Sequence, residues 1–279
     1  NKKMLATFYT TVTKRFAPQN ARVFHSWPSR VKSPLARLIF PPNNALKVCA
    51  QNRCKFSRSF SSFTLPSGER VLYGIIGANL AVFGLWNAAE SDAFYQHSWR
   101  ARKFMHDNFT MSAQGVVNQL KLHTMITSTF SHRELGHLLM NMVTLFFFGR
   151  EAIMILGTKS FLKLYVYGGL TSSACHLGWS MVGPYAGVPG SLMISPYQKS
   201  LGASGAVNAT VLWSCLMFPA RTVYIYMILP VPAAVLGILF VGKDLWGLYE
   251  GGGNVANAAH LGGAAFGTMF YFATRRRFF

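Results

Sequence analysis

The residues of this chain that could most clearly take part in catalysis are a serine and a histidine, each placed among small side chains. Ser204 lies in the run Gly202-Ala203-Ser204-Gly205, and His260 lies in the run 259–263. A hydroxyl is a poor nucleophile until a base takes its proton, and a nearby imidazole meets that need without an obligatory third carboxylate. The two residues therefore predict a serine nucleophile with a histidine base, if the fold brings them together.

Two further polar residues could serve the same reaction. His137 and Asn141 are spaced i and i+4, so they share one face of a helix and can both aim donors at one oxygen. Ser204 is expected in the first turn of its helix, where N–H groups have no intrahelical partner and the dipole favours negative charge. An oxyanion formed by attack of Ser204 would be stabilised there.

Glycines accompany both candidate residues. Gly202 and Gly205 leave the Ser204 hydroxyl unshielded. Gly263 and Gly267 follow His260 at i+3 and i+7, so they lie on the same helix face. Glycines four residues apart let another helix approach closely, and if that helix carries Ser204, the imidazole comes within reach of the hydroxyl.

The elements that must position these residues are apolar helices. The chain is 51% hydrophobic and only 13% charged, far below the roughly 25% charged residues of soluble domains. Several stretches carry almost no charge and approach the ~20 residues that cross a bilayer. They are 71–89, 135–149 with a continuation to 155, 164–182, 200–220, 222–242 and 251–274. Pro230 and Pro232 fall inside the predicted helix 222–242. The pattern predicts an all-α, polytopic membrane protein with a bundle of six transmembrane helices.

Six crossings put both ends of the chain on one side of the membrane. The basic residues agree, because Arg275–Arg277 would lie there with Lys159, Lys163 and Arg221, as the positive-inside rule requires. The opposite side would receive the loops 91–134, 183–199 and 243–250. Ser204, His137 and His260 are then expected near that opposite face, delivered to one depth by three helices. The loop 91–134 suits either an ordinary extramembrane loop or a segment lying partly in the interface.

The first 66 residues differ from the rest and predict a separate leader before a domain at 67–279. Twelve basic residues and no acidic ones occur before Glu69, mixed with Ser, Pro and Phe. This composition is typical of a mitochondrial transit segment and not of a secretory signal. The alternative is a tail for nucleic acid or anionic lipid, but its cations are scattered and no nucleic-acid module follows, so we expect no nucleic-acid partner.

Three motifs in order resemble those of rhomboid intramembrane serine proteases. They are His137-x-x-x-Asn141 preceded by Phe130-Ser131-His132, then Gly202-Ala203-Ser204-Gly205, then Ala259-His260-x-x-Gly263-x-x-x-Gly267. With the basic leader, the chain looks most like the mitochondrial, presenilin-associated rhomboid-like group. The resemblance spans about 70–274. It departs from many bacterial members at Asn208, where those carry a tyrosine, and at Trp99-Arg100, which lies far upstream of His137.

The resemblance implies a catalytic dyad of Ser204 and His260, with the Ser204 N–H, His137 and Asn141 forming the oxyanion hole. It implies cleavage of single-span membrane proteins in or beside their transmembrane helix, in the mitochondrial inner membrane. It implies no cofactor and no metal.

Rival interpretations remain open at this point. One is a non-enzymatic membrane protein that binds haem or quinone, or transports a solute, through His137, His176 and His260. Another is an inactive rhomboid scaffold. A zinc protease is disfavoured because His132 and His137 are five residues apart, with Glu134 two residues after the first, so the ligands misalign. The cysteines predict neither a disulfide scaffold nor a metal site; they are Cys49, Cys54, Cys175 and Cys215.

Overall fold

The described part of the chain is mostly helical, as its apolar runs predict. The computed structural model describes residues 67–91, 98–187, 194–225, 228–250 and 255–277. All of these belong to one unit of the chain, which covers 44–279. The predicted leader, 1–66, lies outside the described residues, so its role stays a prediction.

Long helices correspond to the six apolar runs. They are α4 (Ser67–Glu90), α10 (Thr158–Val182), α11 (Ser204–Met217), α12 (Ala233–Glu250), α13 (Val255–Thr274) and a segment built from α8 (Leu135–Thr144), the π-helical turn η5 (Leu145–Gly149) and α9 (Arg150–Leu156). The shorter elements are α5 (Ser98–Asn108), α6 (Ala113–Val117), α7 (Thr124–Thr127) and the 3-10 turns η4 (Ser128–Phe130), η6 (Gly183–Tyr185) and η8 (Arg275–Arg277).

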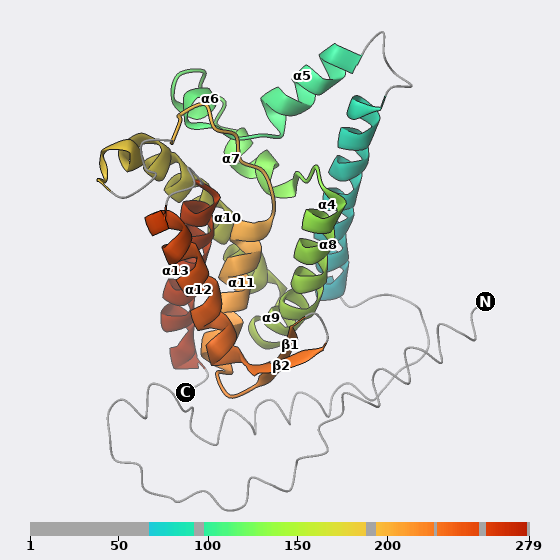
Figure 1. Cartoon of the computed structure of the whole chain (residues 1–279). Coiled ribbons are helices and arrows are strands. Elements are labelled where there is room, and N and C mark those ends of the chain that lie inside the picture. The colour runs from blue at the N-terminus through green and yellow to red at the C-terminus, as the bar shows by residue number, and fades with distance from the viewer. Residues whose placement is uncertain (1–66, 92–97, 188–193, 226–227, 251–254, 278–279) are drawn as a thin grey trace, which may run out of the picture. The chain divides into compact units, whose positions relative to one another are not determined.

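Helix α11 forms the centre of the bundle. It contacts α8, α10, α12 and α13, and Figure 1 shows it between α8 on one side and the pair α12 and α13 on the other. Most of its residues are buried, Trp213 and Val211 completely. A helix with apolar residues on every face has no polar face for solvent, so it is buried among its neighbours.

Two segments in the described residues are long and apolar enough to cross a membrane by length and composition, Gly68–Glu90 and Leu135–Leu156. The remaining helices of the predicted six-helix bundle carry more polar residues or are shorter. The mostly helical fold agrees with the prediction, while six crossings stay a prediction.

The predicted helix over 222–242 is wrong in its first half, up to residue 232, and right from residue 233. Its first part is an antiparallel hairpin of β1 (Thr222–Ile225) and β2 (Leu229–Pro232), in which Thr222 pairs with Pro232. A proline inside a helix removes a hydrogen bond and clashes with the preceding turn, whereas an edge strand tolerates it. Pro230 and Pro232 therefore lie in β2, and α12 begins only at Ala233. The fold is thus not strictly all-α.

The predicted loop 243–250 is also wrong, because those residues form the last turns of α12. The helix begins about three turns and ends about two turns later in the sequence than predicted. The charged residues Lys243 and Asp244, which suggested a loop, are helical.

The segment 91–134 is not an irregular loop, since α5, α6 and α7 lie within it. In Figure 1 these helices lie at the end of the bundle opposite the hairpin. Met111 and Ser200 form an isolated antiparallel bridge through backbone hydrogen bonds of 2.9 and 2.8 Å. This bridge attaches the segment 91–134 to the chain that leads into α11.

Candidate active site

Ser204 is the first residue of α11, as the sequence predicts for a helix start. The chain enters the helix through Gly202, whose φ of +129° is a conformation that residues with a side chain rarely adopt. A β-carbon at Gly202 would also lie 2.7 Å from Cε1 of His137. Glycine is therefore required at this position both for backbone conformation and for the approach of the imidazole.

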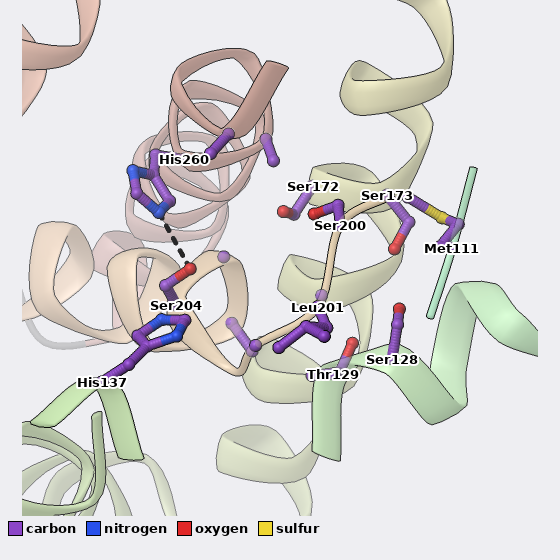
Figure 2. A pocket seen from close by; sticks show the side chains of 16 residues that line it. Met111, Ser128, Thr129, His137, Ser172, Ser173, Ser200, Leu201, Ser204 and His260 are labelled. Carbon is purple, nitrogen blue, oxygen red and sulfur yellow. Dashed lines mark hydrogen bonds between the residues drawn. The ribbon is translucent and has the colours of Figure 1, made fainter. Parts of the chain in front are cut away.

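The structure brings Ser204 and His260 together across two helices. Nε2 of His260 lies 2.8 Å from Oγ of Ser204, which is hydrogen-bond distance. Figure 2 shows the imidazole of His260 on α13 directed at the hydroxyl on α11. This is the arrangement in which an imidazole can take the hydroxyl proton.

The glycines of α13 explain how the two helices come so close. A β-carbon at Gly263 would overlap the carbonyl oxygen of Gly205, and one at Gly267 would overlap that of Ala209. Gly205 itself leaves room for the Ser172 hydroxyl of α10. Small residues thus let the backbones of α11 and α13 touch, which sets the distance between Ser204 and His260.

His137 and Asn141, the two predicted oxyanion donors, are placed differently. His137 lines the pocket around Ser204, and Figure 2 shows its ring beside the serine. Asn141 is buried, does not line the pocket, and donates from Nδ2 to the carbonyl of His137 in its own helix at 2.9 Å. The side chain of His137 therefore faces the pocket beside Ser204, whereas the amide of Asn141 is bound within its own helix.

His132 supports the entry into α11, a role that sequence reasoning did not assign. It is fully buried, and its Nε2 accepts a hydrogen bond from the backbone N–H of Ala203 at 3.3 Å. Burial, and secondly the neighbouring His137, lowers the pKa of His132 to about 3. The imidazole is therefore neutral and can act as an acceptor. The backbone N–H of Gly202 is held in turn by the carbonyl of Ser128 at 2.9 Å.

Asp244 is a second group at the site that the sequence analysis missed. Its Oδ1 lies 3.1 Å from Nδ1 of His260, on the ring edge opposite to Ser204. Asp244 is 3% exposed and comes from α12. An acidic residue between two apolar runs, shortly before the histidine, is the available signal in the sequence, but the pair Lys243-Asp244 locally favours a loop.

His176, the third intramembrane histidine of the sequence analysis, does not join the pocket around Ser204. It is fully buried on α10. His132 and His137 stack edge to face with ring centroids 4.9 Å apart. In the described part of the chain they belong to no cluster of three metal-ligating side chains.

The pocket beside the serine is rich in hydroxyl groups from α10 and from the segments before α8 and α11. Figure 2 shows them to the right of Ser204 and His260. The hydroxyl-bearing lining residues other than Ser204 are Ser128, Thr129, Ser172, Ser173 and Ser200. Such groups can hold water and the polar backbone of a peptide within an otherwise apolar bundle.

A family model for the rhomboid domain matches residues 119–277, which include every residue of the site described above. The chain belongs to the rhomboid family. The resemblance inferred from the three motifs is thereby confirmed. Rhomboids are membrane proteins with several spans, are mostly serine proteases, and cleave membrane-protein substrates.

Curated rhomboids of mitochondria and chloroplasts are similar to this rhomboid chain. RHOMBOID-like protein 12, mitochondrial, of Arabidopsis thaliana is 36% identical over 213 residues, or 75% of this chain and 60% of that protein. Rhomboid-like protein 16, chloroplastic, of the same plant is 30% identical over 214 residues, 74% of this chain and 62% of its own length. The human presenilin-associated rhomboid-like protein, mitochondrial, is 29% identical over 209 residues, covering 74% and 48%. The chain thus spans about half to three fifths of the length of these relatives.

Because rhomboids are membrane proteins, the length of α11 can be compared with the thickness of a bilayer. Its 14 residues rise only about 21 Å, which is less than the ~30 Å hydrocarbon core of a bilayer. The 25 residues of the neighbouring α10 rise about 37 Å and exceed that thickness. A helix of this length does not span the hydrocarbon core by itself.

Proposed function

We propose that this chain is an intramembrane serine endopeptidase in which Ser204 is the nucleophile and His260 the general base. The observation that carries the proposal is the 2.8 Å contact between Oγ of Ser204 and Nε2 of His260, at a helix start that faces a pocket. Membership of a family composed mostly of serine proteases supports it.

In the proposed reaction, Oγ of Ser204 attacks the scissile carbonyl carbon while its proton moves to Nε2 of His260. The imidazolium then gives this proton to the leaving amine, and the acyl group stays on Ser204. A water molecule then gives a proton to His260 and attacks the acyl group. The carboxylic acid product leaves, and the proton returns from His260 to Oγ of Ser204. The pocket hydroxyls supply polar surroundings in which that water can be held.

The developing oxyanion would be stabilised by the backbone N–H of Ser204 and by the side chain of His137. The first N–H groups of α11 have no intrahelical partner, and the helix dipole favours negative charge at this end. Asn141 is proposed as the third donor, and it contributes directly only when its amide turns from the His137 carbonyl towards the pocket.

The proposed substrates are single-span membrane proteins, cut within or beside the transmembrane helix. The proposed location is the mitochondrial inner membrane, supported by the similarity to mitochondrial rhomboids and by the basic composition of residues 1–66. The similarity to chloroplast rhomboids makes import into plastids the other outcome to be tested.

The test is cleavage of a fluorogenic transmembrane substrate by the purified chain in lipid vesicles, compared with Ser204→Ala and His260→Ala. We expect both variants to fold and to lose cleavage, because a nucleophile and its base act as one unit. A serine-reactive fluorophosphonate probe should label the wild type and not Ser204→Ala. Wild-type turnover in either variant would refute the proposal, and loss of activity with chelators would point to metal chemistry instead.

A further inference from the structure

The proposed reaction uses Nε2 of His260, and the structure also gives Nδ1 of the same ring a partner. The carboxylate oxygen Oδ1 of Asp244 lies 3.1 Å from that nitrogen. An ionised carboxylate only accepts hydrogen bonds, so Nδ1 must carry the proton of the neutral ring. Nε2 is then left as the acceptor, which is the tautomer needed to take the proton of Ser204.

The packing of α12 against α13 holds this contact in register. A β-carbon at Gly247 of α12 would overlap the side chain of Asn257 of α13. Gly247 lies three residues after Asp244, and Asn257 lies three residues before His260. The two contacts therefore belong to one antiparallel alignment of the helices. Asp244 and His260 also lie roughly 9 and 8 Å from the adjoining helix ends, at the same depth.

The buried carboxylate of Asp244 needs a partner to offset the free energy lost when it leaves water. The carboxylate side chain is 5% exposed within an apolar bundle, and an unpaired charge there is strongly unfavourable. Lys243 also donates from Nζ to the same oxygen at 3.2 Å, but its side chain is 72% exposed, so solvent screens its charge. The partner of Asp244 inside the bundle is His260.

We propose that Asp244 is a positioning residue that completes a Ser204–His260–Asp244 triad, whereas the sequence alone predicts a dyad. Asp244 holds the imidazole in the productive tautomer and orientation, and it stabilises the imidazolium formed when Ser204 attacks. The proton moves from Oγ of Ser204 to Nε2 and then to the leaving amine; Nδ1 keeps its proton, and the carboxylate stays ionised throughout. This inference rests on the protease function proposed above.

The first test measures kcat and KM separately for Asp244→Ala, Asp244→Asn and Asp244→Glu in lipid vesicles. We expect kcat to fall at least about 100-fold in the alanine and asparagine variants, with KM within about threefold of the wild type. Asparagine restores the volume but not the function, because its amide can donate to Nδ1 and favour the wrong tautomer. Glutamate should recover part of the activity.

The matched control comes from the same helix. Lys243→Gln removes the exposed charge beside Asp244 and leaves the carboxylate in place. This variant should keep kcat within about threefold of the wild type. If it lowers kcat as much as Asp244→Asn, the loss does not depend on the contact with His260 and the proposal is overturned.

The pH profile separates positioning from a structural role. The acid limb of kcat/KM should move to lower pH in Asp244→Asn, because the imidazolium loses its counter-charge. The other titratable groups near the ring are Lys243 on α12 and His137 on α8, and both are unchanged in this variant. A variant that merely contained less folded protein would show a lower amplitude with an unmoved limb.

The labelling rate of Ser204 by a fluorophosphonate keeps the two proposals distinguishable. If Ser204→Ala is inactive while all three Asp244 variants keep the wild-type kcat, labelling rate and pH profile, only the triad is wrong. If Ser204→Ala is active, the protease proposal itself fails. Should Asp244→Ala not fold, the nearly isosteric asparagine variant and the glutamate variant decide the question.

Discussion

At the scale of single residues, the site consists of a hydrogen-bonded pair surrounded by groups that fix its geometry. Ser204 is hydrogen-bonded to His260 of one helix, and His137 of another helix lies beside it. His132 holds the backbone of Ala203 immediately before the serine. Positions that differ in their contacts should therefore differ in the kinetic effect of their loss.

His137→Ala and Asn141→Ala test the proposed oxyanion donors. Loss of one donor typically lowers turnover by a factor on the order of 10²–10³, or roughly 3–4 kcal/mol of transition-state stabilisation. We expect weak but measurable cleavage in both variants, with kcat reduced more than substrate affinity. Fluorophosphonate labelling of Ser204 should be slower without being lost.

Because Asn141 donates to its own helix, its variant distinguishes two roles. Cleavage by Asn141→Ala at the wild-type rate would reduce this residue to a contact within α8. Complete loss of folding in His137→Ala would make that residue structural.

His132 predicts a dependence of stability on pH. Its pKa in the folded chain is about 3, against an ordinary value of 6.5. Below about pH 6.5 the unfolded chain therefore binds a proton that the folded chain does not, so the stability present above that pH is progressively lost as the pH falls towards 3. Thermal unfolding between pH 7.5 and 5 in detergent should show this decline.

His132→Gln is the matched variant for that measurement. The glutamine oxygen can still accept from the N–H of Ala203, but the side chain does not titrate. We expect a flatter dependence of the unfolding temperature on pH than in the wild type. An unchanged slope in His132→Gln would assign the effect to other groups, of which His106 is one, because burial also lowers its pKa.

At the scale of elements, the decisive feature is the contact between α11 and α13. Their backbones meet at Gly205 and Gly263, and again at Ala209 and Gly267. The distance between Ser204 and His260 is thus set by the absence of side chains one and two turns further along α13. A change at this interface should affect activity without touching a reacting group.

Gly267→Ala tests the close approach of the two helices. Its β-carbon would overlap the carbonyl oxygen of Ala209, and backbone cannot move aside as a flexible side chain can. We expect a loss of about 1–3 kcal/mol of stability, as overpacking usually causes, together with slower cleavage. Thermal unfolding and turnover are to be measured on the same preparation.

Gly84→Ala on α4 is the control for this change. Nothing lies within 4 Å of a β-carbon at Gly84, so alanine should be neutral or stabilise the helix by up to about 1 kcal/mol. Equal effects of the two substitutions would argue against close packing as the cause.

At the scale of the whole molecule, charge determines the expected orientation in the membrane. Lys159 and Lys163 lie in the first turns of α10, and Arg275–Arg277 follow α13. Figure 1 shows the hairpin and the end of α13 at the end of the bundle away from α5 and α6. By the positive-inside rule we expect the basic end to face the matrix of the proposed compartment and the start of α11 to face the intermembrane space.

A tag at the C-terminus tests both import and orientation. The chain expressed with its residues 1–66 should enter mitochondria, and the tag should resist added protease after the outer membrane is opened. Digestion of the tag in such mitoplasts would reverse the orientation. Import into plastids alone would replace the proposed compartment.

The sequence by itself determined the helical class and the family, because these depend on composition and on short motifs. It also singled out Ser204 and His260, which the fold brings within 2.8 Å of each other. A long apolar run predicts a helix whichever elements that helix packs against in the fold. Glycines at i+3 and i+7 from His260 also indicated a closely approached helix face, since spacing alone places residues on a face.

Only the tertiary structure decided where the polar residues of α12 and β2 belong. Lys243 and Asp244 predict a loop locally, yet Asp244 is stable in a helix because His260 meets it from another helix. Pro230 and Pro232 leave the predicted helix because an edge strand accepts them. The support of Ala203 by His132 joins residues 71 positions apart. A charge, a proline or a buried histidine is tolerated according to its spatial neighbours, and those neighbours are set by packing between helices that no local pattern encodes.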